Sequence, residues 1–172
     1  MIRGASDQGG EVRGYHHGNL RGALVGAGVE LARAGGPNAV VLRAASRQAG
    51  VSHNAAYRHF ANQEDLLAAV ADRCMSELGR LMIERSSLVT VRGPVRRARA
   101  RLEAIGRAYI DFARTEPGWF RTAFSSARPD PESEPAPDRS DADVDDTNSP
   151  YAILSARLDE LVDVGALTPE RR

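Results

Sequence analysis

The chain has 172 residues, of which 42% are hydrophobic and 27% are charged, a composition typical of a compact globular protein with one or two small domains. Its 23 basic and 23 acidic residues cancel to a formal net charge of +0, which excludes a chain that is a polycation or a polyanion throughout. A single cysteine, Cys74, excludes an internal disulfide, and no apolar run reaches the roughly 18 residues of a membrane span.

The N-terminal residues 1–14 are rich in glycine and polar side chains and lack the apolar core of a signal peptide. We predict a disordered tail here, and a soluble, cytoplasmic protein. Asn19 can cap a first helix whose apolar stripe begins at Leu20, and the sequence Gly35-Gly36-Pro37 ends that helix. The best β-branched run, 38–42, is too short and too isolated to form a sheet, so the predicted fold class is all-α.

Two short helices follow in the layout of a helix-turn-helix. The first is predicted from about Leu42 to Ala49, Gly50 stops it, and Ser52 caps the second, which runs to about Phe60. Gly50 permits the positive φ that the turn needs. The turn predicts that the second helix presents an outward face to a partner.

That second helix carries polar side chains within barely two turns and has few residues suited to burial. The polar ones are His53, Asn54, Tyr57, Arg58 and His59, and the apolar ones are Val51, Ala55, Ala56 and Phe60. Asn54 can donate and accept in one plane, which suits an adenine edge, and Arg58 can pair with guanine or with a phosphate. Histidine and tyrosine can bond phosphates without demanding a base sequence. This composition suits a helix that lies in the major groove of DNA.

Four more helices complete the predicted fold. Asn62 caps a helix that continues to about Ser86, with Asp65 at its third position, and Gly93-Pro94 opens the next, which begins basic, becomes apolar and breaks at Glu116-Pro117. A short helix spans residues 118–124. Ser149 caps the last one, which Gly165 closes.

Residues 126–148 are rich in proline, serine and acidic side chains. Between Asp130 and Asp146 eight acidic residues face a single Arg139, so the rest of the chain carries a compensating basic excess. We predict a disordered acidic loop here, because such a segment buries too little apolar surface to offset the entropy of ordering.

Three stretches in order, "YHHGNLRGALVGAGVELARAGG", "LRAASRQAGVS" and "AAYRHFANQEDLLAAV", resemble the DNA-binding region of the tetracycline-repressor (TetR) family of bacterial transcription regulators. The match runs from Tyr15 to about Leu78 without gaps. A later stretch, "AIGRAYIDFARTEPGWFRTAF", is similar to the regulatory half of one branch of that family. The resemblance implies a DNA-binding domain over residues 15–62 and a helical regulatory domain over residues 63–172.

The family assigns roles to the matching residues of this chain. In the family the first turn of the recognition helix reads base edges, which implies that role for Ser52, His53, Asn54 and Ala55. The resemblance implies that Tyr57 and His59 hold phosphates. Gln63 stands where the family often has a lysine, so we expect a weaker phosphate contact there. Val41 stands where a serine or threonine usually starts the preceding helix.

The resemblance also implies a repressor that binds operator DNA and that a small-molecule effector releases. We expect no cofactor and no catalytic residue, since the sequence contains no motif for either. The residues that we expect to line the effector pocket are Leu78, Met82, Tyr109, Phe112, Trp119 and Phe124. Family members act as homodimers through two further long helices that would follow residue 172. We therefore expect this chain to dimerise poorly and to expose apolar residues of its last helix, Leu154, Leu158, Leu161 and Val162.

Each assignment has a structural alternative. Tyr57 and the predicted pocket aromatics could be plain core, as we expect for Cys74. The arginines at 96, 97, 99 and 101 could form a second nucleic-acid surface or a solvated face. His16 and His17 face apart, and His53 and His59 do not share a helical face, so neither pair predicts a metal site.

Two other functions are alternatives to a transcription regulator. An enzyme is disfavoured, because no catalytic triad, paired carboxylates, phosphate loop or metal-spaced cluster is present in the sequence. An interaction module that keeps the helix-turn-helix only as a scaffold stays open as the alternative function.

Overall fold

The structure of the protein is a computed structural model that describes residues 20–125 and 148–169. Within these ranges the fold is all-α and has no strand, as predicted. The elements are α1 (Leu20–Gly35), the 3-10 turn η1 (Pro37–Ala39), α2 (Leu42–Gln48), α3 (His53–Tyr57), α4 (Gln63–Ser87), α5 (Pro94–Thr115), α6 (Pro117–Ala123) and α7 (Pro150–Asp163). None of these helices is both long enough and apolar enough to cross a bilayer. The predicted cap Asn19, the N-terminal tail and residues 126–147 of the acidic segment lie outside the described residues.

Three helices begin at the predicted caps. The side-chain oxygens of Ser52, Asn62 and Ser149 each accept a hydrogen bond from the backbone N–H three residues later, at 3.2, 2.7 and 3.1 Å. Each bond satisfies one N–H that the first helical turn would otherwise leave without a partner. The sequence therefore predicts where α3, α4 and α7 begin to the residue.

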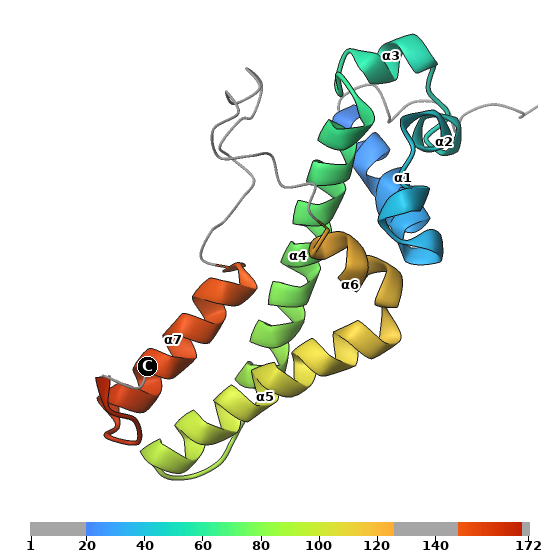
Figure 1. Cartoon of the computed structure of the whole chain (residues 1–172). Coiled ribbons are helices and arrows are strands. Elements are labelled where there is room, and N and C mark those ends of the chain that lie inside the picture. The colour runs from blue at the N-terminus through green and yellow to red at the C-terminus, as the bar shows by residue number, and fades with distance from the viewer. Residues whose placement is uncertain (1–19, 126–147, 170–172) are drawn as a thin grey trace, which may run out of the picture.

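The long helix α4 is the axis of the molecule (Figure 1). Helices α1, α2 and α3 gather at its N-terminal end, and α1 packs directly against it. Helix α5 packs along the other half of α4, and α6 then leads back to α1. Helix α7 lies against both α4 and α5. The arrangement places the helix-turn-helix at one end of α4 and the α4–α5 connection at the other.

Two hydrophobic clusters form the core, and α4 contributes to both. The first joins residues of α1, α2, α3, α4 and α6, including Leu24, Ala45 and Leu66, each 0% exposed. The second joins α4, α5 and α7 around Leu78 and Ile105. Helix α4 is therefore one continuous element that joins the two clusters.

The contact between α1 and α6 depends on a glycine. A Cβ atom at Gly118 would lie 2.3 Å from the carbonyl oxygen of Ala32 and 2.5 Å from that of Arg33. Both distances are shorter than real Cβ contacts, and both neighbours are backbone atoms that cannot turn aside. The first turn of α6 therefore sits directly on the last turns of α1.

Two predictions need correction. Helix α3 ends at Tyr57 rather than near Phe60. Phe60 is 2% exposed, and the backbone N–H groups of Arg58 and His59 donate to carbonyls only three residues back, so the chain turns tightly to bury that ring. In α7, Leu161 is 6% exposed rather than open to solvent, whereas Leu154 is 40% exposed as predicted.

Candidate nucleic-acid interface

The turn between α2 and α3 has a defined hydrogen-bonded geometry. Gly50 has φ 69°, and its N–H donates to the carbonyl of Arg47 at 3.2 Å while that of Val51 donates to Ser46 at 3.0 Å. This pair of bonds is the Schellman motif, which closes a helix through a left-handed residue and here favours glycine. The turn thus fixes the direction in which the chain enters α3.

Helix α3 is held to the protein by few residues. Ala56 is 0% exposed and Phe60 2%, while Val51 packs half-buried against the first core cluster. The guanidinium of Arg21 on α1 lies over the Phe60 ring, 5.2 Å from its centroid. These contacts anchor one side of α3 and leave the opposite side open.

The open side of α3 carries the predicted contact residues. The side chains exposed there are Ser52, His53, Asn54, Tyr57, Arg58 and His59, and Gln63 is exposed at the start of α4. Ala55 is only half-exposed, and the hydroxyl oxygen of Ser52 accepts from its backbone N–H. Tyr57 is 48% exposed, so it is not a core aromatic. Seven of the eight predicted residues thus lie on one accessible end of the molecule.

Two rings on α3 support each other. The His53 and Tyr57 rings meet edge to face, with centroids 4.7 Å apart and planes at 84°. They lie four residues apart, which places them on the same side of the helix. The contact restricts both side chains at the surface.

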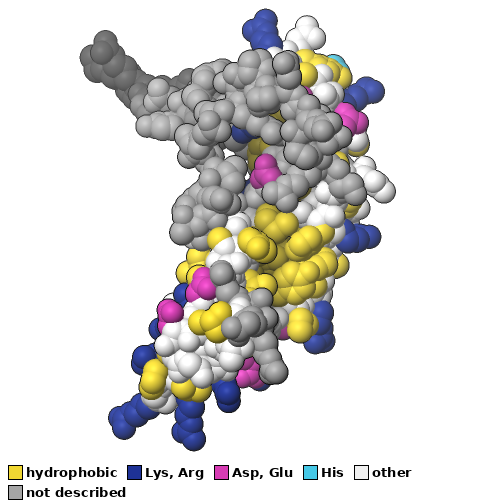
Figure 2. Space-filling view, turned by 60° about the vertical axis from the view of Figure 1, so that its left-hand side comes forward, with side chains coloured by type: hydrophobic (Ala, Val, Ile, Leu, Met, Phe, Trp, Pro, Cys, Tyr) yellow, Lys and Arg dark blue, Asp and Glu magenta, His cyan; other side chains and the backbone are white. Residues whose placement is uncertain are grey.

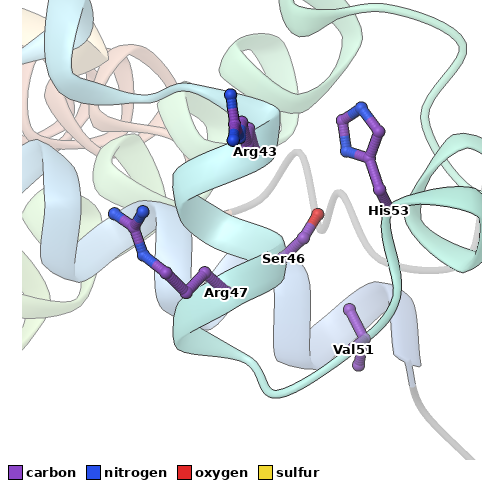
Figure 3. Close-up of a pocket in the computed structure, with 5 residues that line it drawn as sticks. All are labelled: Arg43, Ser46, Arg47, Val51 and His53. Carbon is purple, nitrogen blue, oxygen red and sulfur yellow. The ribbon is translucent and has the colours of Figure 1, made fainter.

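A hollow of about 630 Å³ lies between α2 and α3. It is lined by Arg43, Ser46, Arg47, Val51 and His53. Figure 3 shows Ser46 pointing from α2 toward His53, while the two arginines extend from the α2 ribbon. Ser46 itself is buried, and its hydroxyl donates to the carbonyl of Leu42 at 2.7 Å. The two arginines make the rim of the hollow basic.

Arg43 and Arg47 are interface candidates that the sequence alone does not single out. Both are exposed, and neither has an ion pair with another described residue. Their spacing of four residues on a predicted helix was the available signal, because it puts both on one face. The structure makes this face an interface candidate, because it adjoins α3.

The surface around α3 carries no compensating negative charge from its own segment. No aspartate or glutamate occurs between Glu30 and Glu64, whereas four arginines do. One of these, Arg33, is paired with Glu116 of the α5–α6 junction. The remaining three, Arg43, Arg47 and Arg58, are exposed at the end of the molecule that α2 and α3 form. Such a surface attracts a polyanion.

The predicted pocket residues fall into different surroundings. Leu78, Met82 and Phe112 are buried in the second core cluster. Tyr109 and Phe124 are 38% and 49% exposed and form an aromatic group with Phe120, at centroid distances of 5.3 Å from Tyr109 and 4.8 Å from Phe124. Figure 2 shows hydrophobic side chains gathered over the middle of the molecule.

Trp119 is the sixth predicted pocket residue, and it packs against both core clusters. None of the six lines the hollow beside α3 or a second hollow, between α4 and α7.

The arginines that open α5 lie far from α3. Figure 2 shows arginine side chains at the end of the molecule opposite the helix-turn-helix. Arg96, Arg97 and Arg99 are exposed there, whereas Arg101 is half-buried and paired with Glu160. They therefore lie outside the surface that α2 and α3 form.

Two family models match the chain. One describes bacterial regulatory proteins of the tetR family and covers residues 24–70, which include α2, α3 and their turn. The other describes a tetracyclin repressor-like C-terminal domain and covers residues 102–172. A comparison with curated proteins gave no match.

Proposed function

Because the chain belongs to the TetR family of bacterial regulatory proteins and is a DNA-binding transcription regulator, we propose that it is a repressor released from its operator by a small-molecule ligand. The observation that carries the proposal is the exposed polar side of α3, anchored from behind by Ala56 and Phe60. A buried anchor and an open hydrogen-bonding face are what a recognition helix in a major groove requires.

Base readout is assigned to the first turn of α3. Asn54 can make two hydrogen bonds to an adenine edge, and His53 can donate or accept beside it. The His53 ring also lies edge to face against that of Tyr57. Ser52 keeps a hydroxyl hydrogen for donation, because its oxygen serves as the acceptor at the cap. Ala55 can supply only an apolar contact, such as to a thymine methyl group.

Phosphate contacts are assigned to the residues that flank this turn. Tyr57 and His59 can bond phosphates, as can Arg58 and the more distant Gln63. Arg43 and Arg47 extend the same basic surface along α2. Phosphate contacts set the position and much of the affinity, while Asn54 and its neighbours set the sequence.

Regulation is assigned to α4. Two copies bound to adjacent half-sites must place their recognition helices about 34 Å apart, or one turn of DNA. A ligand among α4, α5 and α7 that shifts the C-terminal half of α4 would also shift its N-terminal half, which packs on α1. Ligand and operator would then disfavour each other's binding by the same factor.

The test begins with fragments of the genome that encodes the chain. The protein is mixed with the fragments, and the retained DNA is sequenced. We expect enrichment of fragments that share an inverted repeat, and reduced transcription in vitro from the adjoining promoter. Retained DNA with the composition of the input would refute sequence-specific binding, and increased transcription would refute the assignment as a repressor.

A further inference from the structure

A second hollow, of about 500 Å³, opens where the C-terminal part of α4 meets α5 and α7. Its lining includes the apolar residues Ile83 of α4 and Ala152 and Ile153 of α7. Ile153 is 6% exposed and belongs to the second core cluster, while Ile83 is 39% exposed. The hollow therefore has an apolar wall that continues from the core to the surface.

The lining of the hollow also carries positive charge. Arg101 of α5 and Arg157 of α7 both line it, and both donate to a single carboxylate, that of Glu160. Each arginine uses its Nη1 atom, at 2.8 Å from a different oxygen of Glu160. Two cations share one anion, so this group of three side chains carries one excess positive charge. The next carboxylate after Ile83 on α4, that of Glu84, is already paired with Arg80.

Arg157 also has an unsatisfied donor. Its Nε atom is buried and has no hydrogen-bond partner among the described residues. Buried donors of charged groups are rarely left unpaired, because the group loses water without gaining another acceptor. A planar guanidinium offers parallel N–H groups that match the two oxygens of a carboxylate. Because the Nε atom is itself closed to solvent, a ligand in the hollow could meet only the remaining Nη groups of the two arginines. The excess positive charge is therefore the feature that points to an anionic partner.

We propose that this hollow binds a small organic anion, a monocarboxylate with an aliphatic body. The carboxylate bonds Arg157 and Arg101, and the aliphatic part covers Ile83, Ala152 and Ile153. Because Ile83 belongs to α4, such a ligand touches the helix that also carries the DNA-binding end. Its role as the effector rests on the proposed function, whereas its binding does not.

The first test is a calorimetric titration of the full chain with octanoate and, separately, with octanamide. The two probes share the aliphatic body and differ in charge. We expect saturable binding of octanoate, with octanamide at least about tenfold weaker because it lacks the charge that the arginines complement. Equal affinities would overturn the anion site, and so would the absence of saturable octanoate binding up to about 10 mM.

The second test determines where on the protein the anion binds. Arg157→Gln should weaken octanoate about tenfold or more and leave octanamide unchanged. Arg99→Gln is the matched control, because it also removes one positive charge. Arg99 lies on α5 about 200° around the helix from Arg101, which lines the hollow. If the control weakened octanoate equally, net charge alone would explain binding and the site would be refuted.

Thermal unfolding of each variant checks its fold, and Arg101→Gln replaces Arg157→Gln if that variant does not fold. The operator assay separates this proposal from the proposed function. Octanoate binding by a chain that binds no operator would refute only the function. Operator binding by a chain that does not bind octanoate would refute only the site.

Discussion

The indole Nε1 of Trp119 on α6 donates a hydrogen bond of 2.8 Å to the backbone carbonyl of Val29 on α1, 90 residues earlier in the chain. The guanidinium of Arg33, one turn further along α1, lies over the same indole ring at 4.4 Å from its centroid. The Nε atom of Arg33 donates to a carboxylate oxygen of Glu116 at 2.8 Å. One aromatic ring therefore ties the regulatory helices to the first helix of the DNA-binding region.

Replacing the indole by a smaller ring tests this link. Trp119→Phe keeps an aromatic ring but removes the donor and some volume, so we expect the free energy of unfolding to fall by about 1–3 kcal/mol. Urea unfolding followed by circular dichroism measures the change, with the m-value unaltered. Tyr151→Phe is the control, because Tyr151 is 80% exposed and its loss of a hydroxyl should change nothing. Equal stability of wild type and Trp119→Phe would show that the hydrogen bond contributes nothing.

The ion pair beside the indole predicts a pH dependence. The hydrogen bond and charge of Arg33 lower the pKa of Glu116 below its ordinary value of 4.5. A carboxyl with a depressed folded-state pKa stabilises the fold above the unfolded value and loses that contribution as pH falls through the folded value. Wild type should therefore be more stable than Glu116→Gln at pH 7, by a small margin because the pair is partly solvated. The margin should vanish as pH falls below 4.5.

An unfolding series at several pH values measures both proteins. A margin that stayed constant from pH 7 to pH 3 would contradict the assigned ionisation.

The alkylation rate of the single cysteine, Cys74, measures how well the core excludes solvent. Burial in the first core cluster raises the pKa of the Cys74 thiol to about 12. At pH 8 roughly one thiol in ten thousand is then ionised, and the reagent must also reach a side chain that is 0% exposed. Alkylation by iodoacetamide should be at least about 100-fold slower in the native protein than in urea. Similar rates in both conditions would mean that α4 does not pack as described.

Much of the fold is predictable from the sequence because local signals decide it. Ser52, Asn62 and Ser149 fix three helix starts, and Gly50 fixes the turn, through bonds that span five residues or fewer. The end of α3 was predicted too late, because burial of Phe60 against α1 and α4 overrides the local helical tendency. The contact of Trp119 with Val29 was also beyond reach, since nothing local pairs residues so distant in the chain.

The candidate interface is also predictable from the sequence only in part. The composition of residues 52–59 predicts an exposed polar helix, and the structure places the polar side chains of this segment at the surface. The sequence does not single out Arg43 and Arg47, because their relevance depends on the angle between α2 and α3. The predicted pocket aromatics were grouped by type, yet Phe112 is core, Tyr109 is half-exposed, and Trp119 faces α1. Aromatic spacing on a helix does not tell which neighbour each ring will meet.

The arginines of α2 should contribute to DNA binding without selecting a sequence. Arg43→Gln and Arg47→Gln should each weaken matched and scrambled DNA alike, and each should reduce the slope of log affinity against log salt by about 1. Fluorescence anisotropy with labelled duplexes between about 50 and 200 mM salt measures that slope. Arg99→Gln, at the opposite end of the molecule, should leave the slope unchanged. A variant that altered base preference instead would place its arginine on a base edge.

The central claim is that the open face of α3 reads DNA sequence, and one comparison tests it most directly. The affinities of wild type, Asn54→Ala, Tyr57→Ala and His59→Ala are measured for a genome-selected operator and for its scrambled sequence. We predict that Asn54→Ala loses about 1–3 kcal/mol on the operator alone. Tyr57→Ala and His59→Ala should instead weaken both duplexes about equally. An Asn54→Ala variant that kept the full preference of wild type for the operator would contradict the account.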